Sequence, residues 1–387
     1  RISVFGATGS IGQNTLDLIR RRRDDFEVVA LSGGRNVAQL AADAREFDAR
    51  VAVTAHDAHL GELRARLDGT PTEAMAGAAA LLEAAARPAD WIMSAIVGVS
   101  GLAPGLAALE QGSTLALANK ESLVCGGPLF MRTARRYGAT VLPVDSEHSA
   151  AFQALAGEEI STVERLIITA SGGPFRDWSA EQMAGVTLKQ ALNHPNWDMG
   201  QRITIDSASL FNKAMELIET KEFFAIEADR IEVLIHPESL IHALVGFNDG
   251  ALMAHLGAHD MRHAIGYALN WPERRPLPVE RLDLARVGQL NFETPDEGRF
   301  PALRLAREVM NSGGLSGAVF NAAKEVALDA FIAGRLGFVE MAVVVEAVMT
   351  KMSDLPGLND GAITLDNVAQ TDHLARIRAR EVIAAKT

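Results

Sequence analysis

The feature that most constrains the fold is a glycine-rich turn near the start of the chain. Residues 2–5 (ISVF) read as a strand, and GATGSIG then places glycines at positions 6, 9 and 12 before a helix-like run. Such a turn presents backbone N–H groups and the positive end of a helix, which suit a pyrophosphate. The sequence therefore predicts a dinucleotide-binding βαβ unit. Because the spacing is GxxGxxG and not the commoner GxGxxG, an unrelated strand-to-helix turn is the alternative.

The first 150 residues alternate between strand-like and helix-like runs, which is the rhythm of a parallel sheet. Strand-like runs occupy residues 2–5, 26–32, 50–54, 91–96, 114–118 and 140–144. Alanine-rich runs at residues 37–47 and 74–86 predict helices, because alanine has the highest helix propensity.

The pattern changes after about residue 150 and again after residue 270. Residues 165–170 are strand-like, and the segment 271–301 is rich in proline and charge, as in a connector. Helical runs follow at 302–311, 317–332 and 339–352. We predict an α/β protein with the following parts: a Rossmann-like parallel sheet that binds NADPH (1–135), a central α/β catalytic and dimerisation domain (136–270), a connector (271–296) and a C-terminal helical bundle (297–387).

Composition narrows the classes of protein. A length of 387 residues predicts two or three domains. The formal charge of −12, with 37 Lys and Arg against 49 Asp and Glu, argues against a nucleic-acid partner. No run approaches the ~18 apolar residues that a membrane helix needs. A single cysteine, Cys125, fits a reducing compartment, and we expect the cytoplasm. The chain begins at Arg1, so whether a targeting peptide precedes it stays open.

The end of the second strand indicates which dinucleotide is bound. It reads Gly33-Gly34-Arg35-Asn36, without the acidic residue that would take the ribose hydroxyls of NAD. Arg35 supplies a planar cation for a 2′-phosphate, so NADP is favoured; a solvated loop cation is the alternative.

Two familiar classes of dehydrogenase bind a dinucleotide at such a glycine turn, and each needs its own catalytic residues. A short-chain dehydrogenase is excluded because neither Tyr137 nor Tyr267 has a lysine four residues later. A semialdehyde dehydrogenase would need Cys125 as its nucleophile. That residue lies in an apolar run, which favours a buried inert thiol.

Two acidic residues follow the strand at 140–144. In an extended chain Asp145 and Glu147 would point the same way and share a hard cation such as Mg²⁺ or Mn²⁺. A solvated acidic turn is the alternative. Lys120 follows the strand at 114–118 and is expected to reach the same crevice as the cofactor.

Residues 206–216 predict a helix that begins with Asp206 and Ser207 as capping residues. Asn212, Lys213 and Glu216 then share one face of it. A surface ion pair between Lys213 and Glu216 is the alternative. Together with Ser207, the group predicts an oxyanion or phosphate site.

Two polar loops complete the candidate site. The loop SGGP at residues 171–174 offers a hydroxyl and backbone N–H groups to an anion. The loop HPNWDMG at 194–200 suits a lid over a bound substrate, with plain packing of its Trp as the alternative. His255, His259 and His263 have helical spacing but lack the glutamate of a zinc-protease helix, so no zinc site is expected there.

Together these motifs resemble the 1-deoxy-D-xylulose 5-phosphate reductoisomerase family. The matching segments, in family order, are residues 6–12, 34–36, 119–121, 145–150, 170–175, 194–200, 206–208, 212–213, 216 and 236–237. The chain departs from the family pattern at Ala7, where Ser is common, at Arg35, where Lys is frequent, and at His259, where Pro is expected.

The resemblance implies the NADPH-dependent isomerisation and reduction of 1-deoxy-D-xylulose 5-phosphate to 2-C-methyl-D-erythritol 4-phosphate, in the non-mevalonate isoprenoid pathway. It implies a homodimer formed through the middle domain. Catalysis would depend on Lys120 and on three residues that hold Mg²⁺ or Mn²⁺: Asp145, Glu147 and Glu216.

The resemblance also assigns the binding residues. Substrate would contact Lys120, Ser146, Ser171, His194, Trp197, Met199, Ser207, Asn212, Lys213 and Glu216. NADPH would contact Thr8, Gly9, Ser10, Ile11, Gly34, Arg35, Asn36, Asn119, Glu121 and Gly200. Two other readings stay open: a semialdehyde-type dehydrogenase that uses Cys125, and a non-catalytic NADP-sensing protein, which would give the acidic pair no purpose.

Overall fold

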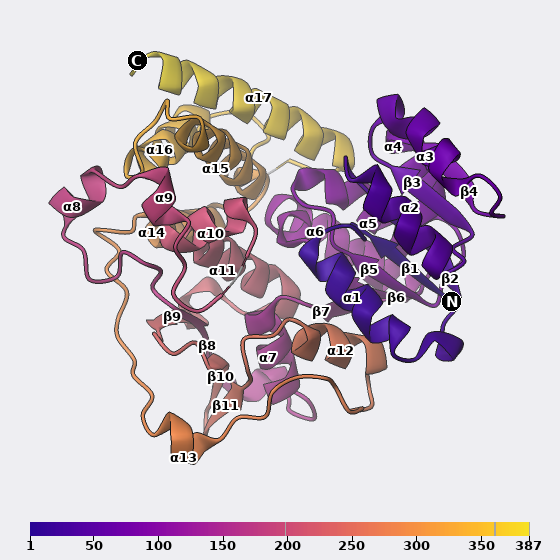
Figure 1. Cartoon of the computed structure of the whole chain (residues 1–387). Helices are drawn as coiled ribbons and strands as arrows, with labels where there is room; N and C mark the ends of the chain where they lie inside the picture. The colour runs from indigo at the N-terminus through magenta and orange to yellow at the C-terminus, as the bar shows by residue number, and fades with distance from the viewer. Residues whose placement is uncertain (198, 360, 387) are drawn as a thin grey trace. The chain divides into compact units, whose positions relative to one another are not determined.

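A computed structural model describes residues 1–197, 199–359 and 361–386 (Figure 1). The chain forms two compact units. The first unit comprises Arg1–Ser122, Phe130–Ser149 and Asp260–Glu280, and the second comprises Leu123–Leu129, Ala150–His259 and Arg281–Thr387. Within the described part of the chain, no helix has the length and apolarity needed to cross a membrane.

The first unit is built on a parallel sheet with the strand order β4-β3-β2-β1-β5-β6-β7. The strands are β1 (Ile2–Phe5), β2 (Val28–Gly33), β3 (Val51–Thr54), β4 (Glu73–Ala76), β5 (Trp91–Ser94), β6 (Thr114–Leu117) and β7 (Thr140–Pro143). Strands β1, β2, β3 and β5 are buried along their whole length, as expected when helices cover both faces of a parallel sheet. The predicted parallel α/β sheet is confirmed. Its order reverses between β1 and β5, and ligands bind at such switch points, beyond the carboxyl ends of the strands.

Helices connect these strands and cover the sheet (Figure 1). They are α1 (Ser10–Arg20), α2 (Val37–Glu46), α3 (Leu60–Leu67), α4 (Gly77–Ala85), α5 (Leu102–Leu109), α6 (Lys120–Tyr137) and the later α12 (Arg262–Asn270). Helix α12 belongs to this unit because it packs on α1, where Arg262 donates to Asp17 at 3.1 Å.

The prediction of one helix across residues 74–86 is wrong at its start. Residues of β4 pair with β3, Glu73 opposite Val51, and only then does α4 begin at Gly77. Pairing with a neighbouring strand overrides the helix propensity of the alanines there, which no local pattern reveals.

The second unit contains a four-stranded sheet with the order β11-β10-β8-β9. The strands are β8 (Val163–Ala170), β9 (Ile231–Ile235), β10 (Ile241–Phe247) and β11 (Leu252–Leu256). Strands β8 and β9 are parallel and the other pairs are antiparallel. Strands β11 and β9 are the two edges of this sheet. The proline-rich segment after α12 contains only the short helix α13 (Leu284–Val287) and one isolated bridge, between Glu293 and Ile235.

Helices form the remainder of the second unit. They are α8 (Ala180–Ala184), α9 (Leu188–Ala191), α10 (Gln201–Ala208), α11 (Phe211–Phe224), α14 (Ala302–Ser312), α15 (Ser316–Ile332), α16 (Glu340–Met352) and α17 (Leu365–Ala384). Helix α15 is buried along most of its length and packs against both α16 and α17. The predicted helical C-terminal region is confirmed, but α17 was not identified. Its buried positions include Ala375 and Ala379, which give a weak apolar pattern.

Candidate functional site

The glycine turn has the conformation that its sequence predicts. Gly6 adopts φ +91°, and a Cβ there would lie 2.3 Å from the carbonyl oxygen of Ala95. A Cβ on Gly12 would lie 2.3 Å from the carbonyl oxygen of Gly6. Helix α1 begins at Ser10, and no described side chain caps it. The first backbone N–H groups of α1 are therefore available to a pyrophosphate.

The loop after β2 lies directly beside this turn. A Cβ on Gly33 would come within 3.0 Å of the side chain of Thr8, and Thr54 donates to the carbonyl oxygen of Gly34 at 2.9 Å. Arg35 and Asn36 are exposed, and the Asn36 side chain caps α2. The predicted residues of the glycine turn and of the 34–36 loop thus gather at the carboxyl ends of β1 and β2.

A third loop at this edge was missed by the sequence analysis. The side chain of Asn119 is buried and donates to the carbonyl oxygens of Ile96, at 2.5 Å, and Gly98, at 2.9 Å. Glu121 accepts from the backbone N–H of Gly98 at 3.1 Å. Asn119 and Glu121 therefore hold the 96–98 loop beside β1, and Val97 projects from it, 73% exposed. The glycine at 98, shortly after the end of β5, is the sequence feature that could have revealed this loop.

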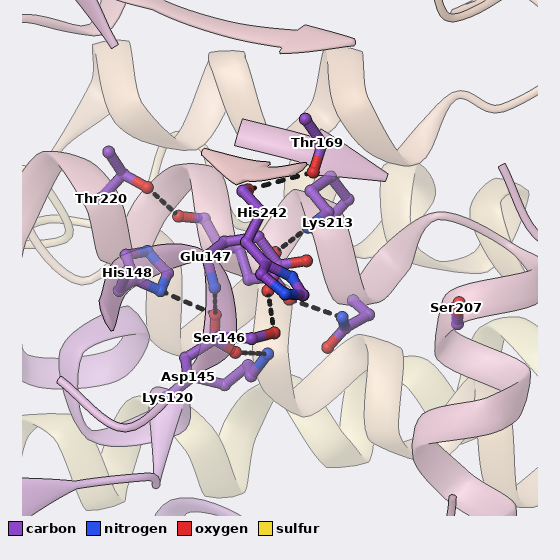
Figure 2. Close-up of polar contacts among 12 residues, drawn as sticks. Lys120, Asp145, Ser146, Glu147, His148, Thr169, Ser207, Lys213, Thr220 and His242 are labelled. Carbon is purple, nitrogen blue, oxygen red and sulfur yellow. Dashed lines mark hydrogen bonds and ion pairs between the residues drawn. The ribbon is translucent and has the colours of Figure 1, made fainter. Parts of the chain in front are cut away.

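A polar cluster follows β6 and β7 in the first unit (Figure 2). Lys120 begins α6, and its ammonium group lies 2.8 Å from the Oδ2 atom of Asp145. His148 Nδ1 lies 3.0 Å from Oδ1 of the same carboxylate. The side chains of Lys120 and Asp145 are only 10% and 11% exposed, and His148 is buried. Asp145 is therefore not part of a solvated acidic turn, the alternative left open by the sequence.

The chain is not extended at Asp145 and Glu147, so the predicted extended pairing of these two carboxylates is wrong. Helix α7 (Ser146–Ala154) begins at once, and Asp145 accepts from the backbone N–H of Glu147 at 3.2 Å. Ser146 donates to Glu147 Oε2 at 2.6 Å. Both carboxylates thus lie at a strand-to-helix junction, which is a frequent position for ligand-binding groups in parallel sheets.

The helix predicted from Asp206 to Glu216 is two helices. Asp206 and Ser207 lie in the last turn of α10 and are not capping residues at a helix start. Leu210 adopts φ +58°, a left-handed conformation that interrupts the helix before α11 begins at Phe211. Asp206 instead forms an ion pair with Lys324 of α15, at 2.8 Å.

The predicted grouping on α11 is present, and its two charged members are buried. Asn212 donates to Glu216 Oε1 at 2.5 Å. Lys213, which is labelled in Figure 2, forms an ion pair with Glu216 Oε2. The side chains of Lys213 and Glu216 are 4% and 1% exposed. This is therefore a buried ion pair and not a surface ion pair. Removing two charges from water costs free energy, which further interactions of these side chains must offset.

His194 is the centre of a second polar cluster in the second unit. Its Nε2 atom lies 3.1 Å from the hydroxyl oxygens of both Ser171 and Ser207. Its Nδ1 atom accepts from the backbone N–H groups of Asn196, at 3.1 Å, and Trp197, at 3.0 Å. A nitrogen that accepts two hydrogen bonds carries no proton, so the proton of the neutral ring is on Nε2. Burial, helped by the charge of His259, lowers the pKa of His194 to about 4.

The loop around Trp197 contacts β10 and the loops next to the sheet of the second unit. The Trp197 ring lies 5.3 Å from that of His259 and 6.3 Å from that of His242. Asn196 donates to the carbonyl oxygen of Pro237 at 2.6 Å. Met199 accepts from Thr204 through its carbonyl oxygen at 3.3 Å, and Gly200 is the N-cap of α10. Asp198 of this motif lies outside the described residues.

Two remaining candidates are placed as follows. Cys125 is 1% exposed within α6. His255, His259 and His263 lie on β11, in a loop and in α12 respectively, so the helical spacing of these histidines does not put them on one helix face.

Comparisons with known proteins agree with one another. Family models match residues 2–127 (1-deoxy-D-xylulose 5-phosphate reductoisomerase), 141–224 (the C-terminal domain of that enzyme) and 256–378 (a DXP reductoisomerase C-terminal domain). The chain is 69% identical to the 1-deoxy-D-xylulose 5-phosphate reductoisomerase of Ruegeria pomeroyi over 386 residues, which is 100% of this chain and 98% of the relative.

Solved structures of the same name are also similar. The reductoisomerase of Zymomonas mobilis in complex with NADPH is 46% identical, with a TM-score of 0.92, and the match covers 99% of this chain and 98% of that one. A DOX-P reductoisomerase in complex with NADPH, fosmidomycin and magnesium is 38% identical, with a TM-score of 0.93 and the same coverage.

Proposed function

We propose a function on the premise that this chain belongs to the 1-deoxy-D-xylulose 5-phosphate reductoisomerase family. The chain is an NADPH-dependent and metal-dependent oxidoreductase. It isomerises and reduces 1-deoxy-D-xylulose 5-phosphate to 2-C-methyl-D-erythritol 4-phosphate, in the non-mevalonate isoprenoid pathway. The observation that carries this conclusion is the family match along nearly the whole chain, together with intact polar clusters at the predicted positions.

The metal ligands would be Asp145, Glu147 and Glu216. Carboxylate oxygens are the ligands that Mg²⁺ and Mn²⁺ prefer, so the donor set fits a hard cation. The ammonium groups of Lys120 and Lys213 contact Asp145 and Glu216, which supports these carboxylates being ionised and ready to bind. When bound, the cation would stabilise negative charge on the carbonyl and hydroxyl oxygens of the sugar, and NADPH would supply a hydride.

The cofactor would be held at the edge of the parallel sheet. The residues proposed for this are Thr8, Gly9, Ser10, Ile11, Gly34, Arg35, Asn36, Asn119, Glu121 and Gly200. The uncapped start of α1 supports the pyrophosphate site, and exposed Arg35 supports preference for the 2′-phosphate. Asn119 and Glu121 would act chiefly by holding the 96–98 loop.

The phosphate of the substrate would be bound by neutral donors and one ammonium group. Ser171 and Ser207 offer hydroxyls, and His194 directs its Nε2 proton toward both of them. Asn212 and Lys213 would complete this set from the start of α11. A neutral imidazole in this position positions hydroxyls without changing its own charge near pH 7.

Lys120 would contact the sugar oxygens and donate protons to them as charge develops, assisted by Ser146. Trp197 and Met199 would cover the substrate and exclude water, so that the aldehyde intermediate is reduced before it is hydrated. The ring contacts of Trp197 with His242 and His259 support a defined position for this loop.

Assembly and location complete the proposal. A homodimer would pair the exposed edge strand β11, where Leu252 is 50% and Met253 42% exposed, with a second copy. The lone cysteine and the absence of a membrane-crossing helix among the described residues are compatible with the cytoplasm. The functional division would follow residues 1–135, 136–270, 271–296 and 297–387.

The test is a spectrophotometric assay of NADPH oxidation. Activity should require both deoxyxylulose phosphate and a divalent ion, vanish with EDTA and return with Mg²⁺ or Mn²⁺. Turnover that persists in EDTA would refute the proposal. Cys125→Ser should leave activity unchanged, whereas a semialdehyde-type dehydrogenase would lose its nucleophile and all of its activity.

A further inference from the structure

A buried carboxylate between α1 and α2 has no part in the proposed chemistry. Asp43 of α2 is 1% exposed, although an ionised side chain is rarely so deeply buried unless its oxygens are satisfied. Two glutamine side chains satisfy it: Gln13 of α1 donates to Oδ2 at 2.7 Å, and Gln39 of α2 donates to Oδ1 at 2.8 Å. Burial raises the pKa of Asp43, and these two donors oppose that change. We call these three residues the Gln13–Asp43–Gln39 network.

One end of the network holds the glycine turn. The same amide nitrogen of Gln13 that donates to Asp43 also donates to the carbonyl oxygen of Ala7, at 2.9 Å. An amide NH₂ has two hydrogens, and these two acceptors use both. Asp43 therefore fixes the orientation of the Gln13 side chain. Gln13 in turn holds the carbonyl group of Ala7, which lies between Gly6 and Thr8 in the glycine turn.

The other end reaches the loop after β2. The backbone N–H of Gln39 donates to Asn36 Oδ1 at 3.2 Å, and this bond is the N-cap of α2. The side chain of Gln39 lies between Asp43 Oδ1 and the Oε1 atom of Gln13, the latter at 3.5 Å. One carboxylate is thus connected through glutamines to Ala7 on one side and to Asn36 on the other.

We infer that Asp43 is a positioning residue for the dinucleotide, since through Gln13 and Gln39 it sets the glycine turn and the 34–36 loop in one mutual geometry. The inference rests on the proposed function, because these two loops are the proposed sites of the pyrophosphate and of the 2′-phosphate. A carboxylate is required because both of its partners are donors. An amide at position 43 would turn its NH₂ group toward Gln39, which would then have to turn over its own amide and give up its donation to Gln13.

The experiment measures NADPH binding directly, by the change in NADPH fluorescence on titration with enzyme, without turnover. Asp43→Asn should raise the Kd for NADPH about tenfold, the factor that corresponds to losing about 1.4 kcal/mol. Gln13→Met should have a similar effect, and it keeps the network testable if Asp43→Asn does not fold. The matched control is Glu46→Gln on the same helix, whose exposed carboxylate pairs with Arg20; it should leave the Kd unchanged.

Steady-state kinetics separate positioning from a structural role. If Asp43 positions the dinucleotide, Asp43→Asn and Gln13→Met should have a higher KM for NADPH, while kcat and the KM for the sugar phosphate stay unchanged. If Asp43→Asn and Gln13→Met unfold at lower temperature but bind NADPH as tightly as the wild type, the inference is wrong and the network is only structural. Failure of NADPH to bind the wild-type protein would instead contradict the proposed function.

Discussion

Two ion pairs join the same two helices, α10 and α15, and differ in burial. Asp206 and Lys324 lie 2.8 Å apart with side chains 11% and 5% exposed. Arg202 and Asp329 form the other pair, with side chains 40% and 55% exposed. Because Asp206 precedes Ser207 of the proposed phosphate site, the buried pair links the C-terminal helices to that site. We expect Lys324→Met to be strongly destabilising and Arg202→Met to be nearly neutral.

The magnitudes follow from burial. At 2.8 Å and an effective dielectric constant of about 20, two unit charges attract by roughly 6 kcal/mol, and desolvation offsets much of this. Removing only Lys324 would leave the Asp206 charge buried, at a cost of about 3–5 kcal/mol. The exposed pair is worth about 1 kcal/mol or less. Adding Asp206→Asn to Lys324→Met should recover part of the loss, because the Asp206 charge is then removed together with its partner.

The assay is thermal unfolding of the four proteins: wild type, the two single variants and the double variant. For a unit of this size, the loss expected for Lys324→Met lowers Tm by on the order of 10 °C, against a few degrees at most for Arg202→Met. The KM for the sugar phosphate should also rise in Lys324→Met. Equal Tm values for the two single variants would refute the reasoning from burial.

Three further predictions concern the proposed site. The pKa of His194 is lowered from 6.5 in the unfolded chain to about 4 in the folded protein, so between these pH values the unfolded chain binds a proton at His194 that the folded protein does not. The free energy of unfolding should therefore fall as pH falls from about 6.5 to 4. An imidazole NMR titration of His194 with a midpoint above 6 would contradict this. In initial-rate assays, Arg35→Gln should raise the KM for NADPH about tenfold or more and leave the KM for NADH unchanged. Equal increases in both KM values would show that Arg35 does not bind the 2′-phosphate. Gly12→Ala should weaken NADPH binding in a fluorescence titration because its Cβ would lie 2.3 Å from the Gly6 carbonyl oxygen, while Gly61→Ala in α3, where nothing lies within 4 Å, should not.

The parallel sheet could be predicted because its strands are buried on both faces and read as short apolar runs between helices. The Lys213 and Glu216 grouping could be predicted because spacing along one helix fixes which side chains share a face. Residues 206–216 were misread because the break at Leu210 is a left-handed leucine, which local propensities disfavour. Strand β4 depends on pairing with β3, and the network around Asp43 depends on how α1 and α2 pack. Neither is encoded in a local pattern.

The chemistry assigned to this chain depends most on Asp145, Glu147 and Glu216 binding a single divalent ion. Titration with Mn²⁺, followed by electron paramagnetic resonance of the free ion, measures this directly. We expect one tightly bound Mn²⁺ per chain in the wild type and in Glu62→Gln, an exposed control. The Mn²⁺ affinity should be lowered roughly a hundredfold in both Asp145→Asn and Glu216→Gln. Wild-type Mn²⁺ affinity in Glu216→Gln, alongside its loss in Asp145→Asn, would contradict this expectation.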